Sequence, residues 1–355
     1  MFQNNSQALQ KFKRNYWGVC SLYFIIALTL VSVFAYFLAP DKSANANNGD
    51  ISLSTLAPGT LIQMIHIKED HSTSIVDYFT GKDKPEVYIP ILSHEIKNDT
   101  LFYQSYAEDV SLSQKKYVDF TQYSSSEYEI ITKKYWLGTD NQGRDYLSRL
   151  LVGSRVSLAI GFVAVAISLL VGVTLGSIAG YFGGKIDALI LWFINIIWSI
   201  PTLLLVIAIT LALGKGFWQV FIAVGLTMWV EVARVVRGQV MSVKQMQYIT
   251  AAKALGYSDF RIIFKHILPN AFAPVIVISA ANFASAILVE SGLSFLGLGA
   301  QVPVPSWGGM IKEHYNYILL GKAYLALLPG LAMCLLVVAF MMIGNALRDA
   351  LDVKN

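Results

Sequence analysis

Long apolar runs constrain this chain more than any other feature of its sequence. A helix needs about 20 predominantly apolar residues to cross a bilayer. Six runs of about that length cover residues 16–38, 156–181, 188–213, 217–236, 271–293 and 324–347. Lipid offers the backbone no hydrogen-bond partners, so such runs must satisfy their own backbone groups as helices. The sequence therefore predicts an all-α integral membrane protein with about six transmembrane helices.

Composition supports a membrane protein and excludes several other classes. Of the 355 residues, 55% are hydrophobic and only 14% are charged, which is too apolar for an ordinary soluble domain. The two cysteines, Cys20 and Cys334, both lie in apolar runs, which indicates packing residues rather than a disulfide or a metal site. We expect no metal and no cofactor. No platform of alternating basic and aromatic residues indicates nucleic-acid binding.

Basic side chains are concentrated on what should be one side of the membrane. Lys11, Lys13 and Arg14 precede the first apolar run, and residues 237–270, which we call the basic loop, separate the fourth and fifth runs. The basic residues in and just before this loop, against Asp259 alone, are Arg234, Arg237, Lys244, Lys253, Arg261 and Lys265. The positive-inside rule places this loop and both termini in the cytoplasm.

A long polar insert follows the first run. Residues 39–135 are rich in serine, tyrosine, aspartate and asparagine, and hydrophobic alternation over 61–68, 87–92 and 128–133 predicts short strands. We therefore expect a cytoplasmic N-terminus at 1–15, a first helix at 16–38, a small α/β or β-containing extracytoplasmic insert at 39–135 and a membrane-spanning core at 136–355. The insert is either a decoration or a docking surface for a binding protein.

After the insert, residues 136–158 predict a turn and then an amphipathic helix at the outer surface. Leu147, Leu150 and Leu151 should enter lipid or protein, while the arginines of the stretch, Arg144, Arg149 and Arg155, stay at the membrane interface. In the second run and the turn after it, four glycines recur at intervals of four and predict a face that packs closely on another helix. They are Gly172, Gly176, Gly180 and Gly184. Pro201 in the third run predicts a kink.

The basic loop has the pattern of two short helices broken at a glycine. Residues 249–255 are good helix formers, and Gly256 follows where a residue with positive φ would end the helix. Ser258 is placed to cap a second helix, with Asp259 in its first turn. Pro269 should end that helix before the next apolar run.

The second loop helix should be amphipathic. The residues expected on its apolar face are Phe260, Ile263, Phe264 and Ile267, with Arg261 and Lys265 on the opposite face. Such a loop between membrane spans needs a partner protein or a membrane surface to cover its apolar face.

Few polar groups within the runs are candidates for function. Asn282 and Glu290 in the fifth run either line a path or make structural polar contacts. Glu231 and Arg234 fall at i, i+3 and predict an ion pair or snorkelling side chains. His66 and His71, the only close histidines, are expected to have surface roles.

The sequence lacks the pattern of an enzyme. No glycine-rich phosphate loop ending in Lys-Ser or Lys-Thr is present, so this chain should not bind and hydrolyse ATP in that manner. No grouping of nucleophile, base and orienting residue indicates a membrane enzyme either.

Several motifs carry a resemblance to a known family. Ala251-Ala252, Gly256 and His-Ile-Leu-Pro-Asn at 266–270 resemble the "EAA" signature of permease subunits in bacterial ABC importers. The likeness is strongest to the second, C-type permease of the dipeptide, oligopeptide and nickel systems. The stretches 136–158 and 290–308 resemble the same family. Thr250 departs from the pattern, because the family usually has glutamate there.

The resemblance implies a type I ABC importer permease in the bacterial inner membrane. Such a permease pairs with a homologous permease, two cytoplasmic ATPase subunits and an extracytoplasmic solute-binding protein, and moves peptides or a related small solute. The residues that would couple it to the ATPase are Thr250, Ala251, Ala252, Leu255, Gly256, Phe260 and Phe264. The alternative is a self-contained channel or ion-coupled carrier, which would need charges along a path.

Overall fold

The computed structural model describes residues 2–67, 76–83, 86–97, 100–107, 115–119, 128–214 and 216–351. They divide into two compact units. The helical unit comprises residues 1–28, 157–301 and 330–355, and the sheet unit comprises 29–156 and 302–329.

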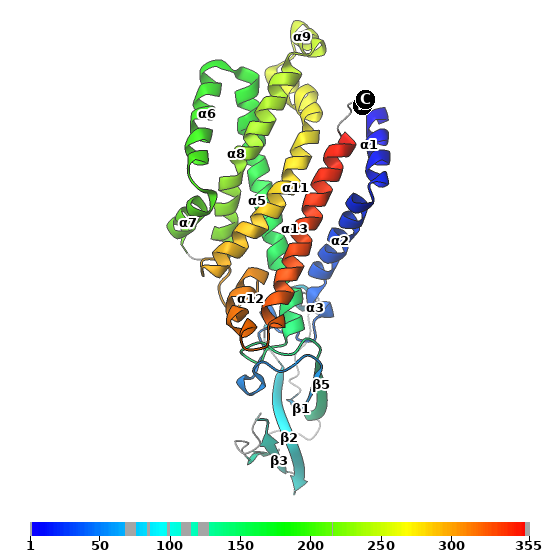
Figure 1. Ribbon diagram of the computed structural model, residues 1–355, viewed down its shortest axis with the longest axis vertical. Coiled ribbons are helices and arrows are strands. Elements are labelled where there is room, and N and C mark those ends of the chain that lie inside the picture. Colours follow the sequence, from blue (N-terminus) through cyan, green and yellow to red (C-terminus); the bar gives the residue numbers. More distant parts are fainter. Residues whose placement is uncertain are drawn as a thin grey trace. The chain divides into compact units, whose positions relative to one another are not determined.

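The helices of this chain are mostly long, as the apolar runs predicted. They are α1 (Phe2–Arg14), α2 (Tyr16–Val33), α3 (Ala35–Leu38), α4 (Asp77–Thr80), α5 (Tyr146–Phe182), α6 (Gly184–Ser199), α7 (Thr202–Leu213), α8 (Phe217–Lys244), α9 (Gln247–Ala254), α10 (Asp259–Ile262), α11 (Leu268–Phe295), α12 (Trp307–His314) and α13 (Tyr324–Leu351). A π-helical turn at Ile263–Ile267 joins α10 to α11. Figure 1 shows α8 beside α11, with α9 beyond the end of α8.

The predicted number of spans agrees with the structure. Among the described residues, five helices are long and apolar enough to cross a membrane: α2, α5, α8, the continuous stretch Asp259–Phe295, and α13. The pair α6 and α7 bends by 96°, and it brings the number to six if the two helices together form one broken span. The expected kink at Pro201 is thus a break, because Pro201 takes an extended conformation at ψ 126°.

Other boundaries differ from the predictions. The first run does not continue as one helix to residue 38, because α2 ends at Val33 and α3 begins at Ala35. The amphipathic helix expected within 136–158 is the first part of α5, which begins at Tyr146 and is 37 residues long. Cys20 and Cys334 are free cysteines, and both side chains are exposed on the chain.

Three of the four glycines bring α5 against α8. A Cβ on Gly172 would lie 2.6 Å from Cβ of Val232, and one on Gly176 would lie 2.5 Å from the backbone oxygen of Ala233. Gly180 meets the backbone oxygen of Arg237 in the same way, at 2.8 Å. Small residues at this spacing let two helix backbones approach closely.

Gly184 does not share this role, contrary to the prediction. It begins α6 with φ +56°, and nothing lies within 4 Å of a Cβ placed on it. The sequence interval of four was the same, but α5 ends at Phe182, so the helical face does not reach Gly184.

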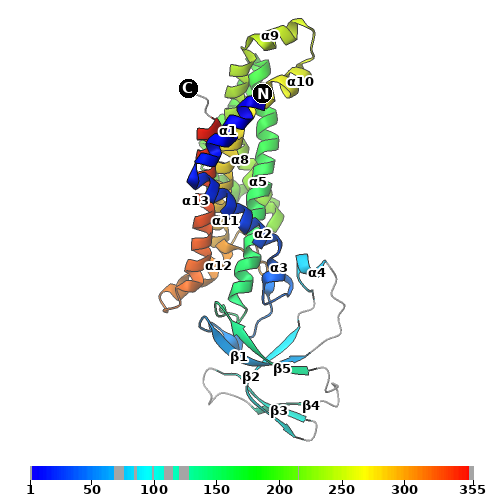
Figure 2. The ribbon, with the colours of Figure 1, turned by 90° about the vertical axis from the view of Figure 1, so that its right-hand side faces the viewer.

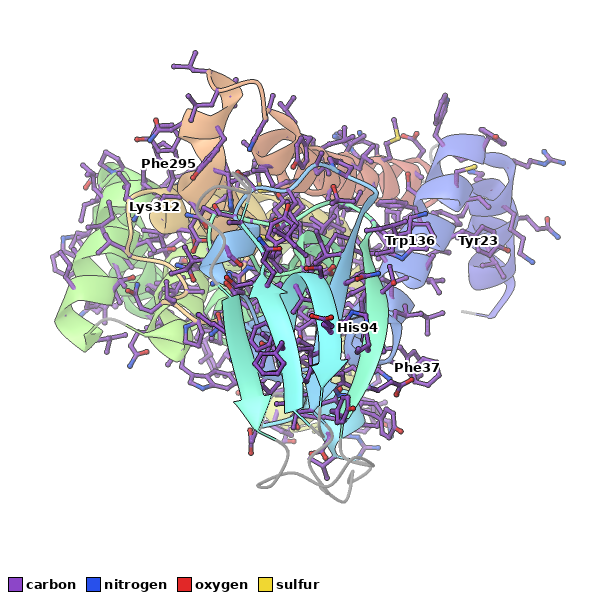
Figure 3. All side chains as sticks on the ribbon, turned by 90° about the horizontal axis from the view of Figure 1, so that it is seen from below. Tyr23, Phe37, His94, Trp136, Phe295 and Lys312 are labelled. Carbon is purple, nitrogen blue, oxygen red and sulfur yellow. The ribbon has the colours of Figure 1, made fainter. Side chains whose placement is uncertain are left out.

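The sheet unit contains a five-stranded antiparallel sheet in the order β4-β3-β2-β1-β5. The strands are β1 (Thr60–Ile67), β2 (Val87–Lys97), β3 (Thr100–Ser105), β4 (Lys115–Asp119) and β5 (Tyr128–Tyr135). Figure 2 shows the strands in this order, and Figure 3 looks onto the sheet with the exposed His94 of β2 labelled.

Side chains on both faces of β1 are buried. Ile62 and Met64 pack with Leu53 and Tyr135, whereas Ile65 packs with residues of β2 and β3. The three alternating stretches fall in β1, β2 and β5, which confirms a β-containing insert; β3 and β4 were not predicted.

The glycine contact gives a first testable prediction. Gly176→Leu should lower the melting temperature of the detergent-solubilised protein, since overpacking a tight contact costs about 1–3 kcal/mol. Gly238→Leu on α8 is the matched control, because nothing lies within 4 Å of a Cβ placed on Gly238. Equal melting temperatures for the two variants would contradict the contact.

Candidate functional site

Gly256 ends α9 as predicted. Its φ is +76°, the left-handed region that glycine adopts without steric cost. The amide of Gly256 donates to the Lys253 carbonyl at 2.9 Å, and the amide of Tyr257 donates to the Ala252 carbonyl at 3.2 Å. This pair of bonds is the Schellman motif, which satisfies carbonyls at the end of a helix.

Ser258 begins α10, also as predicted. Its hydroxyl accepts a hydrogen bond from the amide of Arg261 at 3.4 Å. Asp259, in the first turn, accepts a hydrogen bond from the hydroxyl of Tyr181 on α5. The ammonium of Lys244 at the end of α8 donates to the carbonyl of Tyr181. The basic loop is therefore tied to both α5 and α8.

Pro269 does not end the second loop helix, so that prediction is wrong. The helix continues through the π turn into α11, and the amide of Leu268 donates to the carbonyl of Ile263. A proline has no N–H and its ring crowds the preceding turn, and a wider turn accommodates both effects. The side-chain amide of Asn270 donates to the carbonyl of His266 at 2.7 Å, within the same turn.

The predicted apolar face is split between two directions. Ile262, Ile263 and Ile267 are buried in one cluster with residues of α8 and α9. Phe260 and Phe264 are instead 70% and 56% exposed, with ring centroids 4.3 Å apart. A regular α-helix would place Phe260, Ile263 and Ile267 together, but the π turn interrupts that periodicity.

The expected coupling residues are mostly on the surface. Leu255 is 73% exposed, and together with Phe260 and Phe264 it forms what we call the exposed trio. Thr250 and Ala251 are exposed on α9, whereas Ala252 is buried in the cluster that anchors the loop. Basic side chains accompany the trio: Lys253, Arg261 and Lys265 are all exposed.

The polar residues expected in the fifth run are inside the chain. Asn282 is 1% exposed and Glu290 is 0% exposed. The hydroxyl of Ser294 donates to the Glu290 carboxylate at 2.6 Å, which is a contact within α11.

Of the two alternatives for Glu231 and Arg234, the ion pair is not found in the described part of the chain. The guanidinium of Arg234 lies 3.6 Å from the ring centroid of Trp198 and donates to Asn195 at 3.3 Å. A pair that the sequence did not indicate is Arg237 with Asp187, joined by two bonds of 2.5 and 2.6 Å between α8 and α6.

Arg144 and Arg149 are buried inside the chain, whereas the sequence predicted arginines that stay at the membrane interface. Each is 1% exposed. Arg144 Nε lies 2.6 Å from the Asp140 carboxylate, and Arg149 Nε lies 3.4 Å from it. Glu313 lies 3.2 and 3.8 Å from the same two guanidiniums. The two arginines and two carboxylates form a network that balances their charges, as burial requires.

Asp140, Glu313 and His314 are close enough to hold a metal ion, with ligand atoms within 4.8 Å. Two guanidiniums already contact the carboxylates, so the geometry fits a structural ion network better than a metal site. Burial lowers the pKa of His314, which keeps the imidazole neutral at neutral pH.

His66 is not a surface residue as expected. It is half-buried in β1, and its ring stacks on that of Tyr88 with the centroids 4.6 Å apart. Its Nε2 lies 3.3 Å from the Glu86 carboxylate. Burial raises the pKa of Glu86, but hydrogen bonds from Lys82 and Tyr88 outweigh burial and lower it to about 2. His71 lies outside the described residues.

Apolar spans joined by a basic loop, with that loop anchored and exposing apolar side chains, define a multi-span membrane protein. The family described as "Binding-protein-dependent transport system inner membrane component" matches residues 172–354. A second family, "N-terminal TM domain of oligopeptide transport permease C", matches residues 6–58. This chain belongs to the first of these families, the inner membrane components of binding-protein-dependent transport systems.

Curated relatives are similar over most of their own length. The dipeptide transport system permease DppC of Alkalihalophilus pseudofirmus is 45% identical over 221 residues, covering 62% of this chain and 72% of the relative. The oligopeptide permease OppC of Bacillus subtilis is 40% identical over 223 residues, covering 63% and 73%. The glutathione permease GsiD of Pectobacterium atrosepticum is 40% identical over 220 residues, covering 62% and 73%.

A solved structure, the inward-facing MetNI methionine ABC transporter, matches with a TM-score of 0.48 at 18% identity, covering 57% of this chain and 95% of that chain. The family and the curated relatives identify an ABC importer permease, not a self-contained channel or ion-coupled carrier.

The ion network gives a second testable prediction. Arg149→Ala should lower the melting temperature strongly, since breaking a buried ion pair costs about 3–5 kcal/mol. Lys134→Ala removes an exposed cation over the ring of Trp136 and is the control. Thermal unfolding of both variants in detergent measures the difference, and an Arg149→Ala variant as stable as the control would contradict the network.

Proposed function

We propose that this chain is one of two homologous permease subunits that enclose a translocation path for peptides or a related small solute such as nickel. Two cytoplasmic ATPase subunits drive the cycle, and an extracytoplasmic binding protein delivers the solute. Both termini and the basic loop lie in the cytoplasm, and the insert at 39–135 lies outside. The peptide assignment is supported by the relatives named as dipeptide, oligopeptide and glutathione permeases.

The exposed trio is the observation that carries this proposal. Leu255, Phe260 and Phe264 are each more than half exposed on a loop that other side chains anchor in a buried cluster with α8. Exposed apolar side chains rimmed by basic ones indicate a protein-binding surface. The basic loop is rich in charged residues and connects the ends of two spans. Its partner is therefore a water-soluble domain, and the ATPase subunit is such a domain.

The packing of the loop supports a rigid transfer of motion. Ile249 and Ala252 of α9, with Ile262 of α10, lie in the same buried cluster as Val236 and Val240 of α8. A displacement of the loop by the ATPase must therefore carry α8 with it. Movement of packed helices as rigid bodies is how transporters of this kind alternate between inward and outward access.

Asn282 and Glu290 are assigned to the structure of the helices instead of the path. Both side chains are buried within this chain, where a translocated solute would not meet them. Gly172, Gly176, Gly180 and the break at Pro201 shape the helical unit.

The exposed trio can be tested by co-purification. Phe260→Ser should reduce the amount of ATPase subunit that purifies with the solubilised permease, because hydrophobic contact area at the interface is lost. The melting temperature of the isolated permease should stay the same. Ile51→Ser is the control, since Ile51 is 80% exposed in the sheet unit, far from the loop in sequence. Unchanged recovery of the ATPase with Phe260→Ser would refute the docking role.

Gly256 can be tested by a series of substitutions. Gly256→Val should abolish solute uptake and stimulated ATP hydrolysis in proteoliposomes, because a β-branched residue is strained at φ +76°. Gly256→Asn should retain much of the activity, since asparagine tolerates the left-handed region.

Gly59→Val is the matched control for this series. Gly59 has φ +84° and, like Gly256, open space around a Cβ, but it lies in the sheet unit. The same strain placed there should leave coupling intact. Normal uptake by Gly256→Val would contradict the coupling role proposed for this turn.

A further inference from the structure

Glu231 is an exposed carboxylate of α8, a candidate membrane span, on the side of the basic loop that begins at residue 237. Its neighbours Val230 and Val232 are buried, and Arg234 is engaged with Trp198 and Asn195. Within the described ranges of this chain, Glu231 has no ion-pair partner. A carboxylate is costly in hydrocarbon, so this face of α8 must meet water, a solute or another polar group.

An open groove lies next to this face. It has a volume of about 380 Å³ and is lined by α8, α11 and α13 of the helical unit. Val235, one helical turn after Glu231 and on the same face of α8, is one wall. The remaining lining residues are Ala273, Pro274, Val277, Ile278, Ala281, Arg348 and Leu351.

A positive charge lines the groove, and a negative charge lies near it on α8. Glu231 lies one turn from Val235 towards the N-terminal end of α8, and Arg348 lies near the C-terminal end of α13. Arg348 is exposed, and it is the only charged residue that lines the groove within the described structure. The wall between the two charges is small and apolar.

We propose that Glu231 and Arg348 are specificity-determining residues of the permease, which select a solute carrying a free amine and a free carboxylate. This inference rests on the proposed function. The carboxylate of Glu231 accepts hydrogen bonds from the ammonium group of the passing solute. The guanidinium of Arg348 donates to the solute carboxylate, and the apolar wall accepts its side chains.

Other occupants fit the groove less well. A lipid tail against this face would leave the Glu231 carboxylate in hydrocarbon, and the carboxylate would repel an anionic headgroup. A helix of the second permease would need a cation at the level of Glu231, which is a distinct and testable arrangement.

Transport of end-blocked peptides tests this selection. The complete importer with its binding protein is reconstituted in proteoliposomes, and uptake is measured for trialanine, N-acetyl-trialanine and trialanine amide. Wild type should transport trialanine best. Glu231→Gln should lower trialanine uptake about tenfold, the usual size of a lost charge-assisted hydrogen bond. The same variant should leave uptake of the N-acetylated peptide unchanged, because that peptide has no ammonium group for Glu231 to bind.

Matched variants separate selection from structure. Glu231→Asp should restore part of the preference for a free amine, and Arg348→Gln should reduce discrimination against the amide only. Asp349→Asn, which removes the neighbouring exposed carboxylate on α13, should change neither. Recovery of the second permease and the ATPase should be equal in all variants.

Each other outcome is distinguishable. An equal loss of all three peptides in Glu231→Gln would overturn the selective role, and loss of the second permease would show that Glu231 pairs with that subunit instead. Unchanged preference in both Glu231→Gln and Arg348→Gln would overturn the inference while leaving the proposed function intact. Failure of wild type to take up any of the three peptides, with ATP hydrolysis present, would overturn the peptide assignment and the inference together.

Discussion

The close approach of α5 and α8 is the contact on which the helical unit depends. Lipid provides no hydrophobic force between spans, so helices there associate through tight packing, and Gly172, Gly176 and Gly180 permit that packing. The other faces of α8 contact further helices of the unit. One is joined to α6 by the pair Arg237 and Asp187, others pack against α7 and α11, and the side chain of Glu231 stays exposed.

The basic loop divides its apolar side chains between two tasks. The buried isoleucines of α9, α10 and the π turn continue the core of α8 and α5, so the loop is an extension of the bundle and not a flexible connection. The phenylalanines leave that core and remain exposed. A surface held this firmly loses little conformational entropy when a partner binds, which favours docking and the transfer of force.

Local features of this chain could be predicted from sequence, and features that depend on distant residues could not. The spans, the turn at Gly256 and the cap at Ser258 follow from length, backbone preference and hydrogen bonding within a few residues. The burial of Arg144 depends on Glu313, which is 169 residues away, and no local pattern indicates it. The split between Phe260 and Ile263 depends on a π turn, which has no reliable sequence signal.

The π turn at Ile263–Ile267 also makes the number of residues in this segment important. A π turn holds one more residue than an α turn, so it behaves as a one-residue insertion in an otherwise regular helix. Removal of one residue there would restore the regular helix and rotate everything before it by about 100° relative to α11. The orientation of Phe260 and Phe264 is thus set by a count of residues, and an insertion or deletion in this turn would redirect the surface even if every side chain in it were kept.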